Sequence, residues 1–152
     1  MPESNRVPTI SSQRVRAQNA LCRDCQACLL GCSLYHEGSC SPSLARLRIA
    51  KDMARYEFTI TICRQCTSPA CLPACPTGAM SLDERGVVLI DDAVCTRCGS
   101  CAAACPYDAI YDHQAADRCL KCDLCAGRDG GPLCVTLCPV AALILDAREG
   151  EH

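Results

Sequence analysis

The spacing of cysteines constrains this chain more than any other feature. Four cysteines between Cys95 and Cys105 are separated by two, two and three residues, and Pro106 follows the last one. Proline has no amide hydrogen, so it ends a helical turn and sends the chain onward in an extended conformation. The chain has 18 cysteines in 152 residues, but only one Phe, four Tyr and no Trp. Because large apolar side chains are this scarce, bonds to the cysteines must contribute much of the stability.

The same arrangement recurs along the chain. Sixteen cysteines form four groups of four, and three of the groups end in Cys-Pro with an Ala-apolar pair shortly after it. Repeats about 30 residues apart indicate one structural unit used several times. Cys40 and Cys119 fall outside the groups. The groups are Cys22, Cys25, Cys28 and Cys32; Cys63, Cys66, Cys71 and Cys75; Cys95, Cys98, Cys101 and Cys105; and Cys122, Cys125, Cys134 and Cys138.

Bacterial ferredoxins use this spacing to hold [4Fe–4S] clusters. Three thiolates on a tight loop reach three irons of one cluster, whereas the fourth cysteine leaves on a short helical turn and binds a second cluster. Sixteen cysteines are therefore enough ligands for four [4Fe–4S] clusters. The spacing alone leaves open which groups pair with each other.

Chains rich in cysteine are either metal proteins or disulfide scaffolds. The redox state of the expected compartment distinguishes the two classes. The first residues are polar and contain no readable secretory signal, and no apolar run approaches the length of a membrane span. We therefore expect a cytoplasmic protein without a membrane span, where cysteine clusters indicate metal sites. The formal net charge is −2, and four oxidised clusters with their thiolates bring it to about −10. That charge argues against a nucleic-acid partner.

Only short elements are expected between the cysteine groups. Apolar residues alternate roughly over 44–49 and over 58–62, which predicts two paired strands. Residues 80–82 and 87–90 bracket a predicted turn that contains a glycine. Short helical turns are expected inside the cysteine groups, for instance over 99–104, and no helix is long enough for a bundle. These patterns predict a small, irregular α+β fold.

Four stretches carry a resemblance to a known family: Cys28–Gly38, Pro42–Ile49, Cys63–Cys71 and Lys121–Cys134. The chain resembles the four-cluster ferredoxin-type electron-transfer subunits of molybdenum and tungsten pterin enzymes and of some hydrogenase complexes, over most of residues 21–145. Its short length and its Ser-Leu-Ala-Arg segment are most similar to the small subunit of tungsten-type aldehyde oxidoreductases. Subunits of benzoyl-coenzyme A reductase and of formate hydrogenlyase are alternatives within this resemblance.

The resemblance implies that the outer two cysteine groups pair with each other, and likewise the inner two. Each of four clusters then takes three cysteines from one group and the last cysteine of the partner group. The first set is Cys22, Cys25, Cys28 and Cys138; the second is Cys122, Cys125, Cys134 and Cys32; the third is Cys63, Cys66, Cys71 and Cys105; the fourth is Cys95, Cys98, Cys101 and Cys75. Two pseudo-symmetric bacterial ferredoxin-like modules result, the inner one inserted in the outer one, with four clusters in a file.

Domain boundaries follow from the same resemblance. The first half of the outer module, with a short hairpin insertion, is expected over 21–62, and its second half over 113–146. The inner module is expected over 63–112. An N-terminal extension over 1–20, expected to dock on a partner, and a C-terminal tail over 147–152 complete the chain.

One ligand assignment has an alternative. In the last group, Cys119 can replace Cys125, with a spacing of two, eleven and three that four-cluster subunits also show. The Lys-Cys-Asp-Leu-Cys motif followed by Arg128 and a Gly-Pro step favours Cys125 by resemblance. Cys40 and Cys119 are then expected to be small buried residues, and His36 a structural residue.

Each cysteine group also contains a basic residue: Arg23, Arg64, Arg97 or Lys121. As ordinary surface residues, these side chains would be solvated and would have no role. As cations beside a negatively charged cluster, they would favour its reduced form and raise its reduction potential. The sequence supports both interpretations about equally.

No catalytic or substrate-binding motif is recognisable, so we expect a one-electron relay that is not an enzyme by itself. The resemblance implies a large catalytic subunit with a tungsten or molybdenum pterin, oxidising aldehydes, at one end. A flavin subunit or a soluble ferredoxin is implied at the other end, and a file open at both ends could also continue into a second copy of the chain. The alternatives are a free soluble polyferredoxin, a subunit of a hydrogenase, formate or benzoyl-coenzyme A reductase complex, and a zinc-stabilised interaction module.

Overall fold

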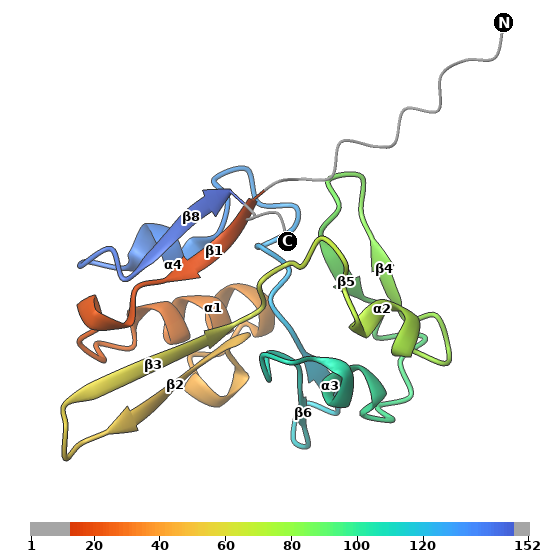
Figure 1. Ribbon diagram of the computed structural model, residues 1–152, viewed down its shortest axis with the longest axis horizontal. Coiled ribbons are helices and arrows are strands. Elements are labelled where there is room, and N and C mark those ends of the chain that lie inside the picture. Colours follow the sequence, from red (N-terminus) through yellow and green to blue (C-terminus); the bar gives the residue numbers. More distant parts are fainter. Residues whose placement is uncertain (1–12, 148–152) are drawn as a thin grey trace, which may run out of the picture.

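A computed structural model describes residues 13–147 and shows an α+β chain of short strand pairs joined by short helices and turns (Figure 1). All strand pairs among these residues are antiparallel and two-stranded. No helix in the described part of the chain is long and apolar enough to cross a membrane. In chain order the elements are β1 Gln13–Ala17, η1 Asn19–Leu21, α1 Ala27–Glu37, η2 Pro42–Leu44, β2 Leu47–Asp52, β3 Glu57–Ile62, α2 Cys71–Ala74, β4 Met80–Leu82, β5 Val88–Ile90, α3 Ser100–Ala104, β6 Tyr111–His113, β7 Arg118–Leu120, α4 Leu133–Leu137 and β8 Leu143–Ala147.

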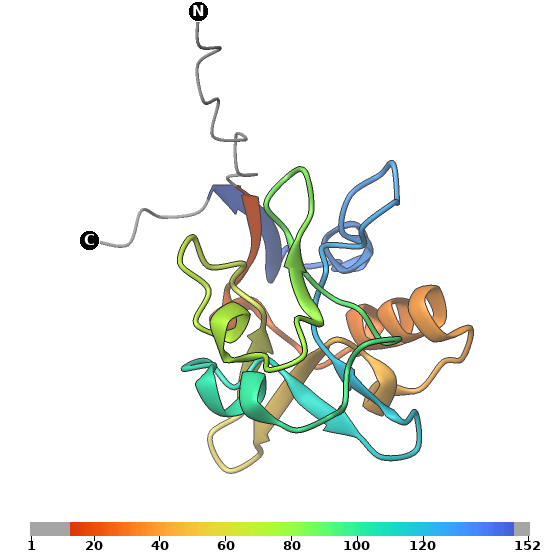
Figure 2. The same cartoon turned by 90° about the vertical axis from the view of Figure 1, so that its right-hand side faces the viewer.

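The elements form two groups, which lie on opposite sides of Figure 1. One group contains the β1–β8 pair, the β2–β3 hairpin, and α1 packed on α4. The other contains the β4–β5 pair and α2 packed on α3. In Figure 2 this second group faces the viewer. The chain therefore leaves the first group after β3 and returns to it before α4.

The β1–β8 pair joins the two ends of the described chain. Val15 lies opposite Leu145 and is only 1% exposed, and the neighbouring Arg16 pairs with Asp146 at 2.6 Å. Residues 1–20 were expected to form an extension, but the chain is already part of a sheet from Gln13. A single buried apolar residue in a five-residue strand is a weak sequence signal, and its partner strand lies far along the chain. The remainder of the expected extension lies outside the described residues.

Both expected hairpins are present, and the fold class is confirmed as α+β. In the β2–β3 hairpin, Leu47 lies opposite Ile62 in the register that alternation requires. The β4–β5 turn is closed by Asp83, whose carboxylate accepts hydrogen bonds from the amides of Arg85 and Val87 at 2.9 and 2.8 Å. Gly86 has a φ of +74°, the left-handed conformation that glycine adopts without strain.

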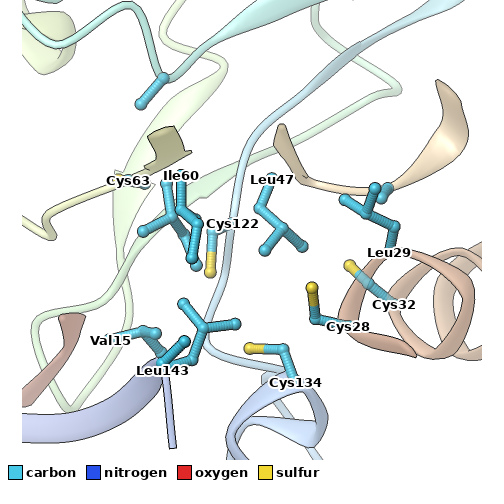
Figure 3. Close-up of a cluster of buried hydrophobic side chains, with 14 of the residues drawn as sticks. Val15, Cys28, Leu29, Cys32, Leu47, Ile60, Cys63, Cys122, Cys134 and Leu143 are labelled. Carbon is cyan, nitrogen blue, oxygen red and sulfur yellow. The ribbon is translucent and has the colours of Figure 1, made fainter. Parts of the chain in front are cut away.

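Cysteines form a large part of the core, as Figure 3 shows. The sulfurs of Cys32, Cys122 and Cys134 face a common space between α1 and α4, with Leu47 and Leu143 beside them. A smaller apolar cluster lies in the second group and consists of Met80, Val88, Cys101 and Ile110. The apolar side chains thus surround the cysteines instead of packing into a core of their own.

Candidate metal centres

Cysteines from both inner groups line one cavity at the start of α2. Cys63, Cys66, Cys71 and Cys105 all line this cavity. Cys63 directly follows β3, Cys71 begins α2 and Cys105 directly follows α3. Three of these cysteines come from one group and Cys105 from the other, so the structure brings the third set together.

A second cavity is also lined by cysteines of both inner groups. Cys95, Cys98 and Cys101 line it together with Cys75 from the other inner group. The two inner groups thus exchange their last cysteines across the α2–α3 contact. Cys119 lines the same cavity, and it is buried at 6% exposure.

The third cavity lies in the first group of elements, where α1 packs on α4. Cys122, Cys125 and Cys134 line it together with Cys32 from α1. This is the second set. The alternative ligand Cys119 is not part of this cavity, because it belongs to β7 and lines the cavity of the fourth set instead.

The first set lies around Cys28 on α1. Burial, with smaller contributions from the nearby thiols of Cys25, Cys138 and Cys22, raises the pKa of the Cys28 thiol to about 11. These electrostatic neighbours are the other three members of the predicted set. Cys138 directly follows α4, so the α1–α4 contact brings it to the first half of the chain.

The first Cys-x2-Cys loop of each of the four cysteine groups has the same backbone form. The second intervening residue has a positive φ in every loop: Asp24 at 54°, Gln65 at 49°, Arg97 at 58° and Leu124 at 56°. A left-handed conformation at a residue other than glycine costs about 1–3 kcal/mol of folding free energy. Such a conformation therefore persists only where the surrounding structure requires it. The tight turn aims backbone amides at sulfur, as with Gln65 to Cys63 at 3.4 Å and Leu124 to Cys122 at 3.4 Å.

Further amides donate to cysteine sulfurs from outside the loops. Arg46 donates to Cys32 at 3.3 Å, Leu133 to Cys125 at 3.4 Å and Ala142 to Cys138 at 3.2 Å. Such bonds stabilise a thiolate and, in iron–sulfur sites, help to set the reduction potential.

Burial works against thiolate formation when no metal is bound. It raises the pKa of the Cys32 thiol to about 11 and that of Cys134 to about 12. A bound metal removes this conflict because a coordinating thiol is deprotonated outright. Within residues 13–147 no three His, Cys, Asp or Glu side chains are close enough to hold a single metal ion. Soft sulfur ligands placed around cavities, with amides directed at them, fit iron–sulfur clusters.

His36 and Arg46 lie at the cavity of the second set, although their positions in the sequence do not indicate it. His36 Nε2 lies 3.9 Å from Cys125 Sγ and 3.4 Å from a carboxylate oxygen of Asp123. Arg46 Nη1 lies 3.4 Å from the other Asp123 oxygen. Burial, assisted by the Arg46 charge, lowers the pKa of His36. Because 89 positions separate His36 from Cys125, no motif could reveal this contact.

The four basic residues of the cysteine groups have different surroundings. Arg23 is exposed, and Arg64 lies over a tyrosine ring with its guanidinium carbon 4.0 Å from the ring centroid. Arg97 forms an ion pair with Asp112 at 2.7 Å. Lys121 alone among them is buried, at 3% exposure. The four cations have similar positions in the sequence, but tertiary packing gives them different exposure and different partners.

Known proteins share these features. The family described as the 4Fe-4S dicluster domain matches residues 54–148. The polyferredoxin-like subunit of an aliphatic sulfonate oxidoreductase from Pyrococcus furiosus is 36% identical over 118 residues, which cover 77% of this chain and 66% of that protein. The thiosulfate reductase electron transfer subunit PhsB of Salmonella typhi is 31% identical over 132 residues, which cover 80% of this chain and 69% of that protein.

Among solved structures, the active site complex BamBC of benzoyl coenzyme A reductase with 1,5-dienoyl-CoA has a similar chain. The TM-score is 0.54 at 24% identity, over 92% of this chain and 78% of that chain. This likeness shows the fold alone: a small α+β arrangement of short strands and few helices. The relatives are named as electron-transfer and polyferredoxin-like subunits of oxidoreductases, and such subunits are not themselves catalytic. This chain belongs to the 4Fe-4S dicluster family and carries several [4Fe–4S] clusters.

Proposed function

We propose that the chain is the electron-transfer subunit of an oxidoreductase complex and relays single electrons through four [4Fe–4S] clusters. The observation that carries this proposal is the gathering of sixteen cysteines into four separate sets of four. When bound, each cluster accepts and donates one electron at a time. The chain itself holds the clusters, shields them from water and directs amides at their sulfur ligands.

The proposed ligands are the sixteen cysteines of the four sets. Two observations support Cys125 over Cys119 in the second set. Cys125 closes a loop with the same left-handed residue as the other three loops, whereas Cys119 belongs to a strand. Cys125 also lines the cavity with Cys122 and Cys134, and Cys119 lines a different cavity.

We further propose two ferredoxin-like modules, the inner over 63–112 and the outer formed by 21–62 and 113–146. In each, two short helices pack together and two cysteine groups exchange their last members. This likeness between the α1–α4 and α2–α3 pairs supports a file of four clusters. The cavities of the second and third sets lie where the two modules meet, because Cys122 of the second set and Cys63 of the third set are electrostatic neighbours.

The proposed partner at one end is a large pterin-containing catalytic subunit in the cytoplasm. Relatives named as subunits of a sulfonate oxidoreductase and a thiosulfate reductase support a catalytic partner of the oxidoreductase class. A tungsten enzyme that oxidises aldehydes is the specific candidate, and it rests on the resemblance over Pro42–Ile49. A flavin subunit or soluble ferredoxin is proposed at the other end, with self-association as a further way to extend the file.

Anaerobic purification with metal analysis tests the relay. We expect about 16 iron atoms per chain, little zinc, and the signals of four clusters on reduction, measured by electron paramagnetic resonance. Cys125→Ser should remove about four irons, whereas its matched control Cys119→Ser should keep all of them. A colourless, zinc-containing protein would contradict the proposal. Co-purification with a pterin-containing subunit separates a complex subunit from a free polyferredoxin.

A further inference from the structure

Lys121 lies buried between the second and third cysteine sets, in a region that we call the crossing. Its side chain lines the cavity of the third set, and the next residue, Cys122, belongs to the second set. The ammonium group donates hydrogen bonds to the backbone carbonyls of Val88 and Cys122, the latter at 2.8 Å. Lys121 therefore touches both groups of elements.

The charge of Lys121 has no counter-ion among the residues the structure describes. The ion pairs among those residues involve other cations, and the hydrogen-bond partners of Lys121 are neutral carbonyls. Burying an ammonium ion without an opposite charge costs several kcal/mol. The cysteine sulfurs on its two sides would supply negative charge. Burial raises the pKa of the Cys71 thiol to about 11, and the Lys121 charge is the main influence opposing that rise.

Gln65 fixes the geometry of this crossing and is fully buried. Its side-chain amide donates to the Cys122 carbonyl at 2.8 Å, and its carbonyl oxygen accepts from the Val88 amide at 2.9 Å. Its own backbone amide donates to Cys63 Sγ at 3.4 Å. Gln65 thus ties a cysteine of the third set to a cysteine of the second set. With Lys121, it satisfies both backbone polar groups of Val88.

We propose that Lys121, held in place by the Gln65 network, stabilises added negative charge at the second and third clusters and raises the reduction potentials of both. Reduction adds one electron to a cluster and breaks no bond, so a nearby unneutralised cation favours the reduced form. This inference rests on the proposed four-cluster relay and names the residue that adjusts its two middle members.

Within residues 13–147, the basic loop residues of the first and fourth cysteine sets are not buried as Lys121 is. Near the first set, Arg23 is exposed and donates to two backbone carbonyls, where water screens its charge. Near the fourth set, Arg97 is neutralised by Asp112 and also pairs with Asp117. The influence of Lys121 should therefore be confined to the two clusters at the crossing between the modules.

Replacing Lys121 by methionine removes the charge and keeps an unbranched side chain that is one heavy atom shorter. In a redox titration of the holoprotein followed by electron paramagnetic resonance, Lys121→Met should lower the midpoint potentials of the second and third clusters. We expect at least a tenfold change in each reduction equilibrium, or about 59 mV for one electron. The first and fourth clusters should shift less. Replacement of one cysteine by serine in each set assigns the signals.

Control variants separate charge from packing. Arg23→Met removes an exposed cation beside a cysteine set and should shift no midpoint potential comparably. Lys121→Arg keeps the cation and should keep both potentials, whereas a drop equal to that of Lys121→Met would overturn the proposal. Gln65→Glu places a carboxylate in the same network and should lower both potentials by neutralising Lys121 in place.

The outcomes distinguish this inference from the relay itself. A wild-type chain with fewer than four clusters would refute the relay, whatever Lys121 does. Four clusters whose potentials are unchanged in Lys121→Met, or all shifted equally, would refute the inference alone. If Lys121→Met fails to retain iron, Gln65→Glu decides the question, and unchanged potentials in that variant would overturn the proposal.

Discussion

The second and fourth cysteine sets have the same number of sulfurs but opposite surroundings. All four cysteines of the second set are buried, with exposures between 5% and 8%. In the fourth set only Cys101 is buried, and Cys98 is exposed. One site belongs to the core that joins α1 to α4, whereas the other lies near the surface. The same ligand pattern therefore occurs at a site that is part of the hydrophobic core and at a site that solvent can reach.

The thiols differ in the same sense. Burial places the pKa of Cys122 well above the usual range for a thiol. In the fourth set, a hydrogen bond with the Thr77 hydroxyl lowers the pKa of Cys75 to about 7, and one with Ser100 lowers the pKa of Cys98. In the fourth site, Cys75 and Cys98 thus ionise more readily than an ordinary thiol, although burial raises the pKa of Cys101. In the second site, burial raises the pKa of all four thiols, so these thiolates depend on the metal. The fourth site is therefore the more accessible of these two sites.

The largest expected effect comes from deleting one ligand in each site. Cys134→Ser should lower the melting temperature of the holoprotein much more than Cys98→Ser, because only the former leaves a disrupted site within the core. Both variants should lose up to about four irons. Circular dichroism melts and iron analysis under anaerobic conditions measure the two effects. Equal melting temperatures in the two variants would remove the proposed difference between the sites.

A smaller effect is expected where α1 and α4 approach each other. A Cβ on Gly31 would lie 2.2 Å from Cδ1 of Leu137, so Gly31→Ala forces that leucine to move. Overpacking of this kind costs about 1–3 kcal/mol, with the lower end expected because a side-chain tip can shift. The thermal midpoint should fall, and the signal of the second cluster should broaden while that of the fourth stays unchanged.

The control for this prediction is the double variant Gly31→Ala with Leu137→Ala, which removes the obstructing atom. It should recover the spectrum of the second cluster, although not the stability lost with the leucine. If Gly31→Ala alone leaves both the melt and the spectra unchanged, close approach of the two helices is not what holds Cys32 and Cys134 in place.

The smallest expected effect concerns the fourth site alone. Thr77 Oγ1 lies 3.5 Å from Cys75 Sγ, and hydrogen bonds to ligand sulfurs raise the reduction potential of a cluster. Thr77→Val keeps the shape of the side chain and removes the bond. We expect a negative shift of the fourth midpoint potential that corresponds to less than a tenfold change in its equilibrium, with the second potential unchanged. A shift in both would mean that the two sites are coupled more strongly than their separate cavities indicate.

Much of the site could be predicted from the sequence because its parts are local. Each Cys-x2-Cys loop and each following helical turn contains its own spacing, and the two hairpins show alternation or a turn within a few residues. Contacts between distant segments of the chain produce no recognisable spacing or alternation in the sequence. The sequence predicts an extension where β1 lies and a structural role for His36, and it gives no sign that Cys119 lines the cavity of the fourth set.

The sequence by itself determined how many cysteine sets there are, because three ligands of each set come from one short segment. The tertiary structure decided which of the cations beside the cysteines is buried. Arg23, Arg64, Arg97 and Lys121 occupy comparable places beside their cysteines, yet only Lys121 is enclosed, because β5 supplies a carbonyl 33 positions away. Burial is a property of what packs around a residue and not of its neighbours along the chain. For that reason the electrostatic difference between the clusters arises only when the chain is folded.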